Sequence, residues 1–148
     1  MKLDENGYKL ICEFEGLRLK PYLCSARIPT IGYGNTYYPN GVRVTLLDKP
    51  ITKDYAFEIF KDIADKFAKR VASMVKKPLT QNQFNSLVSF AYNVGTGNFS
   101  TSTLLKKVNS NPNDLSIRAE FMKWNKANKV VVNGLTTRRK KESDLYFS

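Results

Sequence analysis

The spacing of hydrophobic and polar residues predicts a chain made mostly of helices. Apolar residues recur at helical spacing over residues 4–15, and Gly16 then favours termination of this first helix. A long helix is predicted over residues 52–76, because apolar side chains recur every three or four positions and Thr52 can cap its start. The other face of the long helix is charged, so we interpret it as an amphipathic connector between two lobes.

The remaining pattern predicts a small sheet before the long helix and further helices after it. Residues 20–38 place tyrosine and isoleucine between prolines and glycines, which is typical of short strands joined by turns. Thr80 and Gln83 form a capping-box pattern ahead of another helix, which Gly95 should end. Three shorter helices are predicted over residues 101–109, 115–126 and 137–146. The predicted fold class is therefore α+β, with a small N-terminal β-sheet lobe and a larger helical lobe joined by the long helix.

Composition agrees with one domain over residues 1–148. The hydrophobic content is 42%, enough for a core, and no linker, low-complexity tract or repeat interrupts the chain. The only tryptophan, Trp124, is expected to anchor this core rather than to stack on a sugar. The chain has no histidine, and its two cysteines lack Cys-x-x-Cys spacing, so we expect no metal and no cofactor.

Three residues near the N-terminus are candidates for a small hydrolytic site. Glu15, Cys24 and Thr30 offer a carboxylic acid, a thiol and a hydroxyl, separated by turn-prone residues. At the C-terminal end of a helix the dipole disfavours a carboxylate by roughly 0.3–1 kcal/mol, so Glu15 is better explained as a group that holds a proton. Taken singly, each has an ordinary explanation: a solvated glutamate, a small buried thiol and a strand threonine.

Several segments, in order, carry a resemblance that single residues do not. They are FEGLRLKPY (residues 14–22), Cys24, TIGYG (30–34), SFAYNVG (89–95), STLL (102–105) and GLTTRR (134–139). Together they closely resemble the phage-type lysozymes, glycoside hydrolase family 24, over nearly the whole chain. The site of that family is a glutamate, then an aspartate or cysteine, then a threonine.

The resemblance implies a lysozyme-like fold and a muramidase activity for host cell lysis. Such an enzyme cleaves the β-1,4 bond between N-acetylmuramic acid and N-acetylglucosamine in peptidoglycan. Glu15 would be the proton donor and Arg138 the arginine that orients it, with Arg139 as an adjacent rival. Tyr33 and Gly34 are assigned to substrate binding, since a glycine beside a cleft lets a sugar chain approach the backbone.

Cys24 departs from the aspartate that many members of this family carry. A free thiol is mostly neutral at pH 7, so it stabilises positive charge poorly unless its surroundings favour the thiolate. Two roles stay open: nucleophile on the sugar, or partner of Thr30 in holding a water for direct displacement. The family is usually described as inverting, which favours the water. A disulfide with Cys12 would occupy the thiol, but two reduced cysteines are the expectation.

The net charge of +11 is concentrated in the second half of the chain. Residues 75–148 hold 12 basic and 4 acidic groups, which gives +8. The expected partners are peptidoglycan glycan strands and the anionic bacterial envelope, met by a monomer. A basic nucleic-acid-binding module stays open as an alternative, on the basic run 138–141 and 12% aromatic residues. Another alternative is a catalytically inactive, wall-binding relative in which cysteine at position 24, in place of aspartate, has abolished activity.

The N-terminal residues are charged and lack a continuous apolar stretch. We therefore expect neither a cleavable signal nor stable membrane insertion. The protein would wait in the host cytoplasm until a separate membrane-permeabilising protein released it to the periplasm or cell wall.

Overall fold

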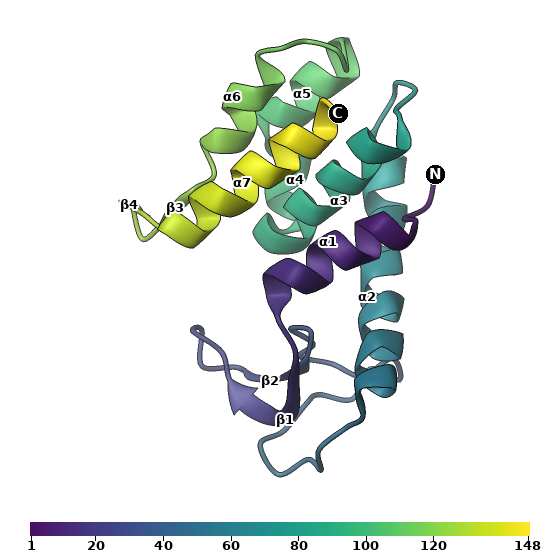
Figure 1. The fold of residues 1–148 in the computed structure, drawn as a ribbon, viewed down its shortest axis with the longest axis vertical. Helices are drawn as coiled ribbons and strands as arrows, with labels where there is room; N and C mark the ends of the chain where they lie inside the picture. The colour runs from purple at the N-terminus through teal and green to yellow at the C-terminus, as the bar shows by residue number, and fades with distance from the viewer. The chain divides into compact units, whose positions relative to one another are not determined.

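The computed structural model describes residues 1–148 and divides into two compact units. The N-terminal unit is Tyr8–Lys66, and the helical unit combines Met1–Gly7 with Phe67–Ser148. Two helices pass from one unit into the other: α1 (Glu5–Glu15) and the long helix α2 (Lys53–Met74). The fold class is α+β, as predicted (Figure 1). None of its helices combines the length and the apolar character needed to cross a membrane.

The sheet of the N-terminal unit is a single hairpin. Strand β1 (Arg18–Leu23) pairs antiparallel with β2 (Pro29–Gly32) (Figure 1). In this pairing Tyr22 lies opposite Thr30. This confirms the prediction of short strands joined by turns. The pairing register is irregular between Arg18 and Tyr22, so the regular part of the ladder is the end nearest the turn.

A compact core supports this hairpin. Ile31 of β2, Val44 and Ile59 of α2 are buried together, and Tyr38 and Ile51 pack against them. The core therefore ties the hairpin to the first half of the long helix.

Local hydrogen bonds confirm the predicted start of α2 and the predicted end of α1. The Thr52 hydroxyl accepts from the backbone N–H of Tyr55 at 3.1 Å. Gly16 has a φ of 69°, and its N–H donates to the Cys12 carbonyl at 3.0 Å. Because Gly16 can adopt this left-handed conformation without a Cβ penalty, α1 stops with Glu15 as its last residue.

The helical unit is built around α3 (Gln81–Val94), which is largely buried and packs against α7 (Asn133–Tyr146) (Figure 1). The capping box is confirmed: the Gln83 N–H donates to the Thr80 hydroxyl at 3.1 Å, and the Thr80 N–H donates to the Gln83 side chain at 2.9 Å. Gly95, with a φ of 94°, ends the helix as predicted.

Aromatic rings fill the centre of the helical unit. Three rings meet Phe90 of α3 edge-on at 5.6–6.1 Å between centroids, and they belong to Phe99, Phe121 and Trp124. Trp124 is half-buried. Its ring is thus engaged in packing, which fits the expected role of core anchor.

The sequence prediction placed the later helices only in part. A helix over residues 101–109 was wrong at its start, because Ser102 separates α4 (Thr96–Thr101) from α5 (Thr103–Ser110). The Ser102 hydroxyl accepts from the Leu105 N–H at 3.1 Å, so this residue caps the second helix instead of continuing the first.

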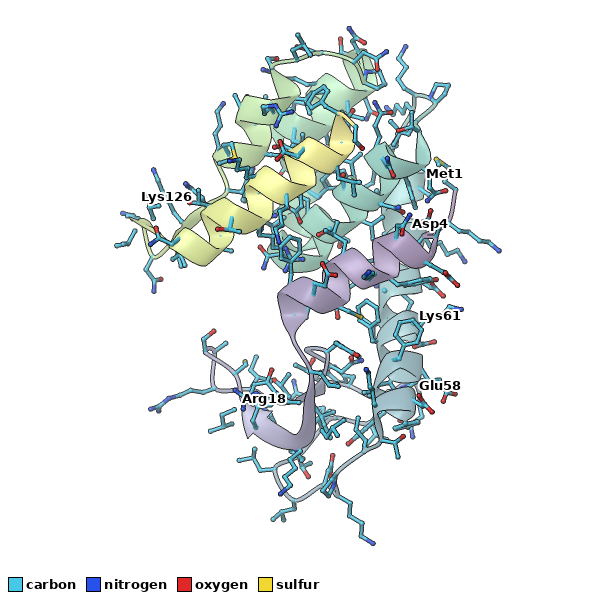
Figure 2. All side chains as sticks on the ribbon, in the orientation of Figure 1. Met1, Asp4, Arg18, Glu58, Lys61 and Lys126 are labelled. Atoms are coloured by element: carbon cyan, nitrogen blue, oxygen red, sulfur yellow. The ribbon has the colours of Figure 1, made fainter.

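The two predicted helices at the end of the chain also need correction. Helix α6 (Ile117–Met122) is shorter than residues 115–126, and α7 begins at Asn133 rather than at residue 137. Between them, β3 (Lys126–Ala127) pairs with β4 (Val130–Val131); Figure 2 labels Lys126 there. Asn128 and Lys129, with φ of 51° and 67°, form the two-residue turn of this unpredicted hairpin.

Candidate active site

The end of α1 holds the Glu15 carboxylate against the backbone at Gly34. A Cβ atom added to Gly34 would lie 3.3 Å from Oε2 of Glu15, and Gly34 has a φ of 86°. Both observations explain why glycine occupies this position: the backbone is left-handed, and the carboxylate approaches it closely. Glu15 itself is half-buried.

Cys24 lies at the tip of the β1–β2 hairpin and extends its ladder by one pair. Its N–H donates to the Ile28 carbonyl at 3.2 Å, and its carbonyl accepts from the Arg27 N–H at 2.8 Å. Arg27 has a φ of 59°, so residues 25–27 form a three-residue hairpin loop that ends in a left-handed residue.

Hydrogen-bond donors of this turn converge on the sulfur of Cys24. The backbone N–H of Ile28 contributes most to lowering the pKa of the thiol, and the N–H of Ala26 acts in the same direction. Burial opposes them only in part. The turn therefore shifts Cys24 toward the thiolate, which answers in part the objection that a cysteine at this position would stay neutral.

Cys12 has the opposite character, although both cysteines are free thiols. Burial, followed by the charges of Glu15 and Glu13, raises the pKa of Cys12 to about 12. Cys12 therefore stays a neutral thiol at physiological pH, and only Cys24 has the surroundings of a reactive thiolate.

Thr30 is brought to Cys24 by the hairpin. The residue is 2% exposed, and its hydroxyl donates to the Ile28 carbonyl at 2.8 Å. When this proton goes to Ile28, the lone pairs of the hydroxyl remain free to accept a hydrogen bond from a water. The thiol of Cys24 and the hydroxyl of Thr30 thus lie on the same hairpin, and their catalytic assignment stays a prediction.

Tyr22 lies on the same hairpin and was missed by the sequence analysis. Its ring is half-buried, and the Arg18 guanidinium lies over it at 4.8 Å from the centroid; Figure 2 labels Arg18 on β1. Burial raises the pKa of Tyr22 most, Arg18 opposes this, and the charges of Cys24 and Glu15 both act to raise it. The phenol is therefore within electrostatic reach of both the acid and the thiol.

The Tyr33 ring is placed in the core of the N-terminal unit. The residue is 8% exposed, and its ring meets Phe60 at 5.6 Å between centroids. Little of the ring remains available to a ligand, so a substrate contact would fall on the backbone beside Gly34. The assignment of Tyr33 and Gly34 to substrate binding stays a prediction.

The two candidate arginines lie on α7 in the helical unit and are both buried. Arg139 is 0% exposed and fully engaged: it donates to Glu142, to Asn93 and, at 2.9 Å, to the Trp124 carbonyl. Arg138 donates to the Ser89 carbonyl at 3.0 Å and to Glu142 at 3.2 Å. All the nitrogen groups of Arg139 are engaged within this unit, which argues against an acid-orienting role for Arg139. The assignment of that role to Arg138 stays a prediction.

This burial also bears on the nucleic-acid alternative. Of the basic run at residues 138–141, Arg138 and Arg139 are 5% and 0% exposed, and only Lys140 and Lys141 face solvent. Only two of the four basic residues in this run are therefore exposed, so the basic patch on the surface is smaller than the sequence indicated.

A hairpin unit that carries an acid, a thiol and a hydroxyl, together with a helical unit built around α3, defines a lysozyme-like protein. The comparison with known families agrees. The Phage lysozyme family model matches residues 12–142, and the chain belongs to this family.

Similar proteins support this membership. The chain is 39% identical over 150 residues to an endolysin of Bacillus phage B103, covering 100% of this chain and 55% of the relative, so it spans about half the length of that protein. The solved endolysin of Escherichia coli O157:H7 phage FAHEc1 is 38% identical with a TM-score of 0.93, covering 100% of this chain and 94% of the other. The muramidase domain of SpmX from Asticaccaulis excentricus is 30% identical with a TM-score of 0.84, covering 99% and 98%.

Proposed function

We propose that this protein is a peptidoglycan hydrolase of the muramidase type that acts in host cell lysis. It hydrolyses the β-1,4 bond between N-acetylmuramic acid and N-acetylglucosamine. The observation that carries the proposal is the Cys24–Thr30 pair on the hairpin, in the same compact unit that holds the Glu15 carboxylate against Gly34. Membership of the phage lysozyme family and similarity to endolysins and to a muramidase domain support it.

The proposed reaction divides proton transfer between two groups. Glu15, in its acid form, donates its proton to the departing glycosidic oxygen as the bond to the anomeric carbon breaks. A water attacks that carbon from the opposite face, and the Cys24 thiolate accepts the proton it loses. Thr30 accepts the other hydrogen bond of this water and orients it. The product then has inverted configuration.

Direct attack by the Cys24 sulfur is the competing step. It would form a glycosyl–cysteine intermediate, and its hydrolysis would give retained configuration. NMR analysis of the newly formed anomer distinguishes attack by water from attack by the sulfur. We expect inverted configuration, and retained configuration would identify the sulfur as the nucleophile.

The rest of the chain is assigned supporting roles. Arg138 orients the acid by family resemblance, and both units together form one catalytic domain over residues 1–148. The charge of +8 on residues 75–148 attracts the anionic envelope and raises the encounter rate at low salt. The protein acts as a monomer and is released from the host cytoplasm to the wall by a separate permeabilising protein.

Digestion of purified peptidoglycan tests the proposal. We expect mass spectrometry to find fragments with reducing muramic acid ends from the wild type, and a loss of at least 100-fold in their release for Glu15→Gln, since an amide cannot donate the proton. Glu13→Gln is the matched control: this residue is exposed on the same helix turn, and its variant should retain activity. Anhydro ends would indicate a lytic transglycosylase, and equal activity of wild type and Glu15→Gln would overturn the assignment.

A further inference from the structure

We propose that Tyr22 is a further catalytic residue of this site, and that its hydroxyl donates a hydrogen bond to the attacking water. The proposal rests on the muramidase activity proposed above. It assigns a third contact to the water that Cys24 and Thr30 are proposed to hold.

The register of the hairpin places the three side chains on one face. Tyr22 lies directly opposite Thr30, and Cys24 follows Tyr22 by two residues in the same ladder. Side chains alternate along a strand, and directly opposed residues have Cβ atoms about 5 Å apart, so these three point to the same side. The charges of Cys24 and Glu15 both act on the phenol, which is in keeping with this placement on the hairpin.

The Tyr22 hydroxyl is also uncommitted within the protein. Hydroxyls of Tyr8, Tyr38 and Tyr146 donate to Asp65, to Asp48 at 2.7 Å and to the Pro112 carbonyl at 2.7 Å. The Tyr22 hydroxyl makes no such bond, while the Arg18 guanidinium over its ring restrains the ring position. A restrained phenol with a free O–H is suited to donate to a bound molecule.

The Tyr22 hydroxyl would satisfy a lone pair of the attacking water that the other contacts leave without a donor. A water has two protons and two lone pairs. In the proposed arrangement one proton goes to the Cys24 thiolate and the other to the Thr30 oxygen, whose own proton is donated to Ile28. One lone pair attacks the anomeric carbon, and the second needs a donor. The Tyr22 O–H supplies it and so fixes which lone pair faces the sugar.

The test compares Tyr22→Phe with wild type on soluble, uncrosslinked peptidoglycan strands. Phenylalanine keeps the ring under Arg18 and removes only the hydroxyl, so the thermal unfolding midpoint should not change. We expect kcat to fall 10- to 100-fold with KM within twofold of wild type, because the hydrogen bond is made to the water and not to the resting sugar. Tyr37→Phe is the control: Tyr37 is 39% exposed and its hydroxyl only accepts from Arg43, so kcat should not change.

Every other outcome overturns the inference. A kcat within twofold of wild type would show that the hydroxyl has no role, and a raised KM with unchanged kcat would make it a sugar-binding group. Glu15→Gln is measured in parallel to separate this result from the proposed function. If the wild type releases no muramic acid ends, the function itself fails; if wild type and Glu15→Gln differ as expected and Tyr22→Phe does not, only the role of Tyr22 fails.

Discussion

The two cysteines should differ strongly in their reaction with an alkylating agent. The turn donors lower the pKa of Cys24 from its ordinary value of 9.0, whereas burial and neighbouring carboxylates raise the pKa of Cys12 to about 12. A thiol with the ordinary value of 9.0 is about 3% thiolate at pH 7.5, and Cys12 is about 3 × 10⁻⁵ thiolate, so even an unshifted thiol exceeds Cys12 by about 1,000-fold. The more basic thiolate is intrinsically more nucleophilic, by up to about 30-fold over this difference in pKa. Because the turn lowers the pKa of Cys24 further, we expect a selectivity of at least about 30-fold for Cys24.

Limited treatment with iodoacetamide, followed by proteolysis and mass spectrometry, measures this selectivity. We expect one adduct, on Cys24, and a parallel loss of peptidoglycan cleavage. The alkylation rate of a Cys12→Ala variant should rise with pH through a midpoint below the ordinary value of 9.0, because more thiolate forms as the pH passes the lowered pKa of Cys24. Cys24→Ala should react slowly at every pH below about 10. Comparable labelling of both residues, or a midpoint above 9, would refute the conclusion that the turn favours a thiolate.

Two further variants test the packing around the site and in the helical unit. Gly34→Ala should lose about 1–2 kcal/mol of unfolding free energy, because the backbone φ at this position is 86°. It should also lose most peptidoglycan cleavage, because the added Cβ would lie 3.3 Å from the Glu15 carboxylate. Gly41→Ala is the control: φ is 85° there but the space around it is open, so it should lose similar stability and no activity. Glu142→Gln should cost about 3–5 kcal/mol in urea unfolding, since it leaves two buried guanidiniums without their carboxylate. Asp144→Asn on the same helix, 55% exposed, should cost no more than about 1 kcal/mol, and equal losses for these two variants would contradict the argument.

The parts of the fold that follow from local hydrogen bonds could be predicted from the sequence. Thr80 with Gln83, and the glycines at 16 and 95, act within one helical turn, so their spacing alone identifies the ends of α1 and α3. Ser102 was missed because the apolar pattern continues across it, and only the structure shows its hydroxyl capping α5. The β3–β4 hairpin was missed because its turn, Asn128-Lys129, contains no glycine or proline.

The candidate site could be predicted as a set of residues but not as an arrangement. Glu15, Cys24 and Thr30 are candidates through their resemblance to a family motif, which specifies residue types and their order. Which neighbours share their face depends on the hairpin register, and register depends on the turn. In this turn Arg27 adopts the left-handed conformation. A glycine at this position would have predicted a three-residue loop, but an arginine does not. The side chain at position 22 therefore could not be assigned to the same face as Cys24 and Thr30 before the pairing was known.

The basic run at residues 138–141 shows why charge along the sequence is a poor guide to charge on the surface. Positions three and four apart lie on one face of a helix, so Glu142 meets both Arg139 and Arg138. All three are buried against α3, where Ser89 also donates to Glu142 at 2.5 Å. A buried cluster of two cations and one anion is tolerated because nearly every polar group in it has a partner. The arginines that resemble a nucleic-acid patch in the sequence are therefore part of the protein interior, and a weak interaction with DNA would have to arise from the dispersed lysines instead.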